Sequence, residues 1–203
     1  KPVFQWAESR SLPVFILGGG ANILVSDQGF DGLVLKIEIS GIEIKQENNS
    51  SILLSVKPAM PWDEVVEMAV NNQWWGIENL SHIPGSSGAF AVQNVGAYGQ
   101  EASEVVEELV VYDRLSGEEK ILTNQQCNFG YRQTIFNTTE RNRYVILETV
   151  LRLSKIPKPK LSYPDLKNRF QGLNPDIKQI REAVIAIRNR KFPYPKQAIN
   201  GNA

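Results

Sequence analysis

The stretch FILGGGANILVSD, residues 15–27, places three consecutive glycines directly after an apolar, strand-like run. A Rossmann fingerprint needs G-x-G-x-x-G at the start of a helix, and here Ile23 stands where the third glycine is required. The Gly-Lys-Ser/Thr of a Walker loop does not follow either. Because the chain then returns to strand character, Gly18, Gly19 and Gly20 are predicted to form a strand–turn–strand loop. Its backbone N–H groups either bind an anion or only make a tight turn.

A second glycine-rich stretch, IPGSSGAFAVQNVGAYGQE, spans residues 83–101. A short helix is expected from about Ser87, and Gln93 and Asn94 carry amides that suit the polar edge of a heterocycle. Two glycine cradles in one chain favour a long ligand that contains a diphosphate. The alternative is that these glycines only allow close packing of the backbone.

The composition is that of a globular protein, with 203 residues and 42% hydrophobic residues. Lys and Arg total 22 and Asp and Glu total 22, so no basic surplus argues for nucleic acid or an anionic membrane as a partner. With one cysteine, Cys127, and one histidine, His82, the chain has neither an intrachain disulfide nor a Cys/His set for a metal. We therefore expect no metal site.

The pattern of apolar runs predicts an α+β fold. The expected strands, rich in Val, Ile and Leu, are 13–17, 32–37, 41–46, 51–56, 105–112, 119–123 and 144–154, with a hairpin turn at 113–119. One helix is expected to begin with Pro61 at its first position. A second is expected to be capped by Asn174, to begin at Pro175 and to stop before Pro193. The Pro- and Lys-rich segment 155–164 is expected to be an exposed loop.

Five segments in this order resemble the UDP-N-acetylenolpyruvoylglucosamine reductase (MurB) family. They are LGGGANILVSDQGFDGLVL, GIENLSHIPGSSGAFAVQNVGAYGQE, NFGYRQTIF, LSYPDL and RNRKFPYPKQAINGNA. Three positions depart from the family pattern: Ala21 and Thr134 stand where serine is usual, and Pro164 stands where glycine is common. LSYPDL is similar to the tyrosine-loop motif of the family's longer subclass.

The resemblance implies an FAD-binding fold of the vanillyl-alcohol oxidase type. It would have a first FAD-binding subdomain in residues 1–45, a second with the tyrosine loop in 46–190, and the start of a substrate-binding domain in 191–203. The implied cofactor-binding residues are Gly18, Gly19, Gly20, Ala21, Asn22, Ile83, Pro84, Gly85, Ser86, Gly88, Gln93, Asn94, Gly96, Ala97, Tyr98 and Gly99. In this interpretation the two glycine stretches clamp the FAD diphosphate from two sides.

The implied reaction passes a hydride from NADPH through FAD to the enol ether of UDP-N-acetylglucosamine enolpyruvate, giving UDP-N-acetylmuramate for peptidoglycan. Arg132 would be catalytic, because a guanidinium can meet the charge that develops on an enolate beside a carboxylate. Tyr131, Tyr163 and Lys191 would bind substrate, with Tyr163 as a lid. The plainer alternatives are a surface ion pair for Arg132, a surface-anchored loop tyrosine for Tyr163 and a helix-end cation for Lys191.

The resemblance also implies a cytoplasmic monomer acting on a small molecule, with no nucleic acid or membrane partner. By the same pattern the chain stops at Ala203, two residues before the family's catalytic serine, so we expect this chain alone to hold FAD without completing reduction. Two alternatives stay open. One is another FAD-dependent oxidoreductase of the same fold, which would need neither YRQTIF nor LSYPDL. The other is a non-catalytic nucleotide-binding module.

Overall fold

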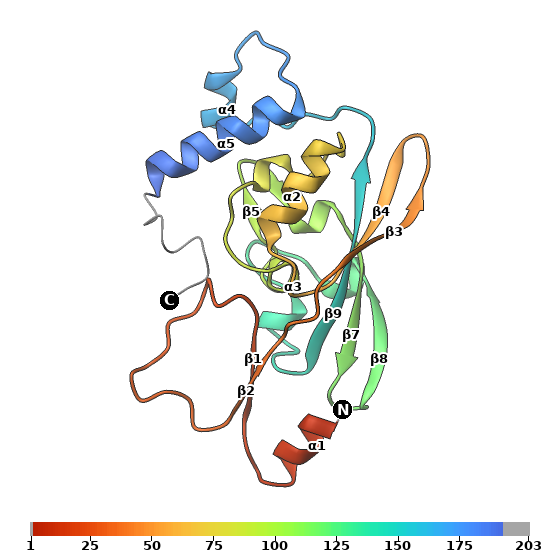
Figure 1. The fold of residues 1–203 in the computed structure, drawn as a ribbon, viewed down its shortest axis with the longest axis vertical. Helices are drawn as coiled ribbons and strands as arrows, with labels where there is room; N and C mark the ends of the chain where they lie inside the picture. Colours follow the sequence, from red (N-terminus) through yellow and green to blue (C-terminus); the bar gives the residue numbers. More distant parts are fainter. Residues whose placement is uncertain (1, 193–203) are drawn as a thin grey trace.

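The centre of the computed structural model, which describes residues 2–192, is a five-stranded antiparallel sheet in the order β3-β4-β9-β7-β8 (Figure 1). Its strands are β3 (Ile42–Glu47), β4 (Ser51–Val56), β7 (Val106–Asp113), β8 (Glu118–Thr123) and β9 (Tyr144–Ser154). β-branched and other aliphatic residues predominate in the three central strands β4, β9 and β7, as the apolar pattern requires. The expected α+β class and every expected strand are confirmed, each to within one residue at its ends, and the expected hairpin turn joins β7 to β8.

The helices are α1 (Pro2–Glu8), α2 (Trp62–Asn71), α3 (Ser87–Val92), α4 (Pro164–Arg169) and α5 (Ile177–Lys191), and short 3-10 turns lie at Glu78–Leu80, Ala102–Glu104, Gln125–Cys127 and Ile135–Asn137. Helices α2 and α3 form the core together with the sheet, and α5 packs on α2. The apolar stripe of α5, which includes Ile180 and Val184, is buried as predicted. Trp62 of α2 stacks on Phe90 of α3, with ring centroids 3.6 Å apart. This stack joins α2 to the helix of the second glycine stretch.

The predicted helix starts were wrong by one or two residues. Pro61 is the N-cap of α2 rather than its first residue. The cap of α5 is Asp176, not Asn174, because the Asp176 carboxylate accepts a hydrogen bond from the Gln179 N–H and the Gln179 side chain accepts one from the Asp176 N–H. This reciprocal capping box satisfies two backbone donors at once, which outweighs the helix-starting preference of Pro175.

The first glycine stretch follows one strand and leads to another, as predicted, but the connection between them is longer than a single turn. β1 (Val14–Leu17) pairs in parallel with β2 (Leu33–Lys36), so the chain must travel back along the strands, and it does so through an irregular connection over residues 18–32. This pair and α1 lie at one end of the molecule, and α4 and α5 lie at the other (Figure 1). A small hairpin of β5 (Gly96–Ala97) and β6 (Gln100–Glu101) completes the elements.

The expected subdomain boundary between residues 45 and 46 falls inside β3, which belongs to the five-stranded sheet. The expected start of a further domain over 191–203 lies almost wholly outside the described residues. The segment 155–164 runs mainly exposed, as predicted, up to Pro164, where α4 begins. No helix among residues 2–192 combines the length and apolar character needed to cross a bilayer.

Replacing Glu148 with glutamine is expected to lower the free energy of unfolding at pH 7 by about 2 kcal/mol. Burial raises the pKa of Glu148, but hydrogen-bonded ion pairs with Lys45 and with Lys57 (2.6 Å) outweigh it and bring the pKa to about 2. A carboxyl whose pKa is lower in the folded than in the unfolded state stabilises the fold at every pH above its unfolded-state pKa. This stabilisation is lost as the pH falls from about 4.5 towards 2. Urea midpoints at pH 7 and pH 3 measure the effect.

The matched control is Glu119→Gln, which changes an exposed carboxylate on β8. We expect the difference between wild type and Glu148→Gln to shrink at pH 3, whereas Glu119→Gln stays close to wild type at both values. An equal loss of stability at pH 7 and pH 3 would show that the ion pairs do not carry the effect.

Candidate functional site

The two glycine stretches, far apart in sequence, lie side by side and line one cleft of about 570 Å³. A Cβ added to Gly19 would lie 3.4 Å from the Gly85 Cα, and a Cβ added to Gly18 would lie 3.0 Å from the Ser86 Oγ. A Cβ on Gly18 would thus be tight against the Ser86 side chain and one on Gly19 would be in van der Waals contact with Gly85, so the two stretches touch directly here. The geometry that the two-sided clamp requires is present.

The predicted cofactor-binding residues divide between this first cleft and a second one. The first cleft collects Gly18, Gly19, Gly20, Ala21, Asn22, Ile83, Pro84, Gly85, Ser86, Gly88 and Gln93. The second cleft, of about 510 Å³, collects Asn94, Gly96, Ala97, Tyr98 and Gly99 together with Tyr131, Arg132, Tyr163 and Lys191. Every predicted site residue thus lines one of two clefts. Within the second glycine stretch, the predicted residues up to Gln93 line the first cleft and those from Asn94 onward line the second. Their roles at these places stay predictions.

The first cleft fits an elongated, anionic cofactor such as FAD. Its volume is in the range of cofactor sites, and backbone groups of both glycine stretches border it. The Ser86 Oγ is buried and has no hydrogen-bond partner among the described residues, although a buried hydroxyl normally has one. Across the cleft, the Asn22 amide donates to Gln93 Oε1 at 2.9 Å and ties the two stretches together. An orphaned hydroxyl beside a glycine cradle is a donor set that suits a diphosphate oxygen.

The far wall of the first cleft was not predicted from the sequence. Phe136, Asn137, Arg141, Asn142 and Tyr144 line it, from the 3-10 turn at 135–137 and the start of β9. Arg141 is the only charged side chain in the described lining, and its Nε donates to the Asn137 carbonyl at 2.8 Å. The run TERNRY that contains Arg141 has no glycine or motif to mark it, so only the folded chain brings it to the cleft.

In the second cleft, Arg132 lies across the small hairpin of the second glycine stretch. Its Nη2 donates to the Gly96 carbonyl at 2.8 Å, and the side chain is exposed. Its backbone has a φ of +55°, and that of Tyr98 has a φ of +47°, in the left-handed region that such residues rarely adopt. Conformations of this kind cost about 1–3 kcal/mol each and gather at functional sites, where the surrounding structure holds them. Thr134, two residues on, caps the 3-10 turn at 135–137 and so anchors the loop of Arg132.

Tyr163 and Lys191 meet over Tyr98. The Tyr163 ring packs edge-on against the Tyr98 ring, with centroids 5.2 Å apart, and the Lys191 Nζ lies 6.0 Å from the Tyr98 centroid. Lys191 also pairs with Asp165 at 2.7 Å, and this hydrogen bond raises the pKa of Lys191, so the amine is charged at neutral pH. The Lys191 ammonium is thus paired with Asp165 in the lining of the second cleft, and its contact with substrate stays a prediction. Tyr131, 83% exposed, stands at the rim.

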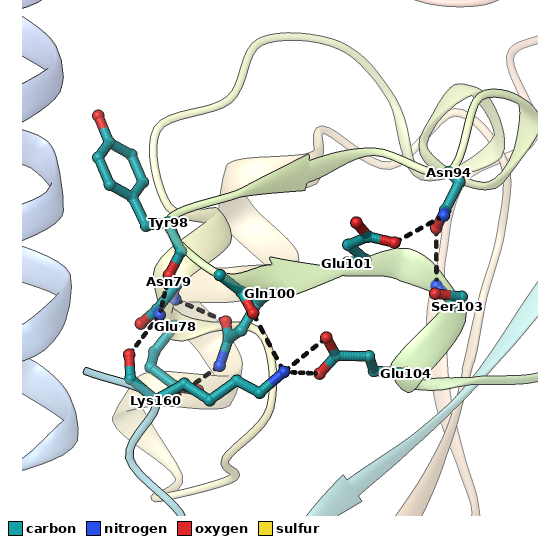
Figure 2. Close-up of polar contacts among 10 residues, drawn as sticks. Glu78, Asn79, Asn94, Tyr98, Gln100, Glu101, Ser103, Glu104 and Lys160 are labelled. Atoms are coloured by element: carbon teal, nitrogen blue, oxygen red, sulfur yellow. Dashed lines mark hydrogen bonds and ion pairs between the residues drawn. The ribbon is translucent and has the colours of Figure 1, made fainter. Parts of the chain in front are cut away.

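The Asn94 side chain does not serve as the free amide donor that was expected. Its Nδ2 donates to Glu101 Oε2 at 2.9 Å and its Oδ1 accepts from the Ser103 N–H (Figure 2). The Nδ2 also donates to the Gly130 carbonyl at 2.9 Å. Both amide protons are therefore engaged within the protein. Asn94 is part of the frame that joins the second glycine stretch to the loop of Tyr131.

Polar contacts from α5 fix the entry to the second glycine stretch. Arg188 Nε donates to the His82 carbonyl at 2.9 Å, and Arg181 makes two hydrogen bonds to Asp63, whose carboxylate also accepts from the His82 N–H. Burial opposes the charge on Asp63, but its contacts with Arg181 and His82 lower the net pKa. His82 is thereby held from both sides, directly before the cleft residues that begin at Ile83.

Cys127 is buried, and burial raises the pKa of its thiol to about 12, so it is an inert core residue.

Comparison with known proteins identifies the family of the chain. Residues 1–121 match the family model described as "FAD binding domain". The chain is 41% identical over 207 residues to the UDP-N-acetylenolpyruvoylglucosamine reductase of Amoebophilus asiaticus, with 100% of this chain and 60% of that protein covered. It is 39% identical to the same-named protein of Porphyromonas gingivalis, covering 92% of this chain and 55% of the relative. The resemblance to this reductase family is confirmed.

The fold comparison agrees. The crystal structure of UDP-N-acetylenolpyruvylglucosamine reductase (MurB) from Thermus caldophilus superimposes with a TM-score of 0.66 at 20% identity, covering 95% of this chain and 60% of that one. The expected FAD-binding fold is therefore confirmed. The chain spans about half to three fifths of the length of the curated relatives it matches. By its sequence match and its fold, the chain belongs to the family of FAD-binding domains.

Proposed function

We propose that the protein carrying this chain is an NADPH-dependent flavoenzyme that reduces UDP-N-acetylglucosamine enolpyruvate to UDP-N-acetylmuramate. The observation that carries the proposal is the arrangement of the two clefts. The glycine-walled first cleft fits FAD, and residues of the same second glycine stretch also line the second cleft, together with Tyr131, Arg132, Tyr163 and Lys191. The names of the relatives at 35–41% identity support the same activity.

FAD, when bound, supplies two-electron hydride transfer between a nicotinamide and the enol ether. The backbone groups of Gly18–Gly20 and Gly85 and the Ser86 hydroxyl hold its diphosphate in the first cleft. In the second cleft, Arg132 binds the substrate carboxylate and meets the negative charge that grows beside it, because a guanidinium offers two parallel N–H donors. Lys191 faces the substrate diphosphate, and Tyr163 covers the cleft and keeps out water.

The remaining parts of the proposal concern the setting of the enzyme. We infer that it acts in the cytoplasm as a monomer in peptidoglycan synthesis, with a nucleotide sugar as its small-molecule partner.

The experiment that tests the activity follows the flavin of the purified whole protein under anaerobic conditions. NADPH is expected to bleach the flavin absorbance near 450 nm, and UDP-N-acetylglucosamine enolpyruvate is expected to restore it with one equivalent of product. Bleaching without restoration by this substrate favours another oxidoreductase of the same fold. A protein that stays colourless after incubation with FAD favours a non-catalytic module and contradicts the proposal.

A further inference from the structure

One buried side chain, Asn79, connects the two segments that carry Tyr98 and Tyr163. Its Nδ2 donates to the Tyr98 carbonyl and to the Lys160 carbonyl, both at 2.8 Å, and the residue is fully buried (Figure 2). Its Oδ1 has no hydrogen-bond partner among the described residues. These two acceptors fix which way the Asn79 amide is turned, because a flipped amide would point its oxygen at two carbonyl oxygens.

The Lys160 side chain makes a second connection between the same segments. Its Nζ donates to the Gly99 carbonyl at 3.0 Å and pairs with both carboxylate oxygens of Glu104, at 2.6 and 2.7 Å. Figure 2 shows this ammonium group between the Glu104 carboxylate and the turn after Tyr98. A Cβ on Gly99 would lie 3.7 Å from the Ser162 Oγ and 3.9 Å from the Tyr163 Cβ, so the segment also packs directly on this turn.

A buried hydrogen-bond chain holds Asn79 itself in place. The Asn79 N–H donates to Gln100 Oε1, the Gln100 Nε2 donates to Glu78 Oε1, and Glu78 Oε2 accepts from the Gly76 N–H. The lengths of these bonds lie between 2.7 and 2.8 Å. Such a connected buried network fixes one geometry, because breaking a single link leaves a polar group without a partner.

We propose that Asn79 and Lys160 are positioning residues that set where the Tyr163 segment stands over the second cleft. They touch neither reacting atoms nor the cofactor cleft; they act through Tyr163. The proposal rests on the proposed function for the identity of the ligand, a nucleoside-diphosphate sugar. The hydrogen bonds by which Asn79 and Lys160 fix the segment do not depend on that function. Lys158, exposed in the same segment, is the matched control for Lys160.

The test uses the whole FAD-loaded protein and measures the dissociation constant of UDP-N-acetylglucosamine by calorimetry. Lys160→Met is expected to weaken this binding about five- to tenfold, and Lys158→Met less than about twofold. The double variant Lys160→Met/Tyr163→Ala is expected to bind no more weakly than Tyr163→Ala alone, because both changes act through one group. FAD affinity is expected to stay within about twofold of wild type in all of them.

A second measurement follows the segment without a ligand. Asn79→Asp places a carboxylate oxygen against two carbonyl oxygens, so deuterium uptake in residues 155–163 is expected to rise at pH 7, while Asn174→Asp, at an exposed position, leaves it unchanged. Fully additive Lys160 and Tyr163 effects, or unchanged uptake in a folded Asn79→Asp, overturn the proposal. If wild type does not bind the nucleotide sugar, the proposed function fails. The uptake of Asn79→Asp and of Lys160→Met then decides whether these residues hold the segment.

Discussion

Gly85→Ala is expected to weaken FAD binding by about 100-fold while the protein stays folded. The Gly85 backbone has a φ of +115°, a conformation that residues with a Cβ rarely adopt. A Cβ there would lie 3.8 Å from the Ala21 Cβ, on the side where the two glycine stretches face each other. The variant therefore faces backbone strain of about 1–3 kcal/mol and a methyl group inside the space that the FAD diphosphate needs. Titration of the apoprotein with FAD, followed by flavin fluorescence, measures the effect.

Gly172→Ala is the matched control for backbone strain. Gly172 has a φ of +72° and nothing within 4 Å of an added Cβ, so the change costs stability without touching either cleft. We expect Gly172→Ala to lower the melting temperature and to bind FAD as wild type does. Wild-type FAD affinity in Gly85→Ala would contradict the two-sided clamp, because the strained glycine would then have no part in holding the cofactor.

Arg132→Lys is expected to lower kcat by about 10³-fold and to leave FAD affinity unchanged. Lysine keeps the positive charge but loses the planar pair of donors that a carboxylate and a developing enolate require. The two half-reactions separate this role from a structural one. Bleaching of the flavin by NADPH is expected at the wild-type rate, whereas its restoration by UDP-N-acetylglucosamine enolpyruvate is expected to slow by the full factor. Anaerobic stopped-flow absorbance measures both steps.

Arg114→Lys controls for the loss of a surface guanidinium. Arg114 is, like Arg132, bonded to a carbonyl, with its Nη1 2.7 Å from the Asn142 oxygen, but it lies outside the second cleft. We expect it to retain wild-type rates in both half-reactions. Equal rates of flavin restoration in Arg132→Lys and wild type would remove Arg132 from the chemistry and leave it the plainer role of holding the Gly96 carbonyl.

Much of the local structure could be predicted because it depends on neighbouring residues. Strand positions followed from apolar runs, and the buried stripe of α5 followed from helical periodicity. The errors came where two local signals competed, as at Asp176, where a capping box four residues long outweighs Asn174 and Pro175. The parallel pairing of β1 and β2 was also missed, because strand direction depends on where the chain returns and not on the glycines themselves.

The candidate site shows the same division. The sequence by itself determined the motif residues that line both clefts, among them Gly85, whose positive φ admits few other residues. Only the tertiary structure decided that Arg141 lines the first cleft and that both N–H groups of the Asn94 amide bond to other protein groups. It also decided that the Asn79 side chain bonds to the carbonyls of both Tyr98 and Lys160. The residue type fixes how many hydrogen bonds a side chain can donate and accept. Which partners it finds depends on segments that only folding brings within about 3 Å of it.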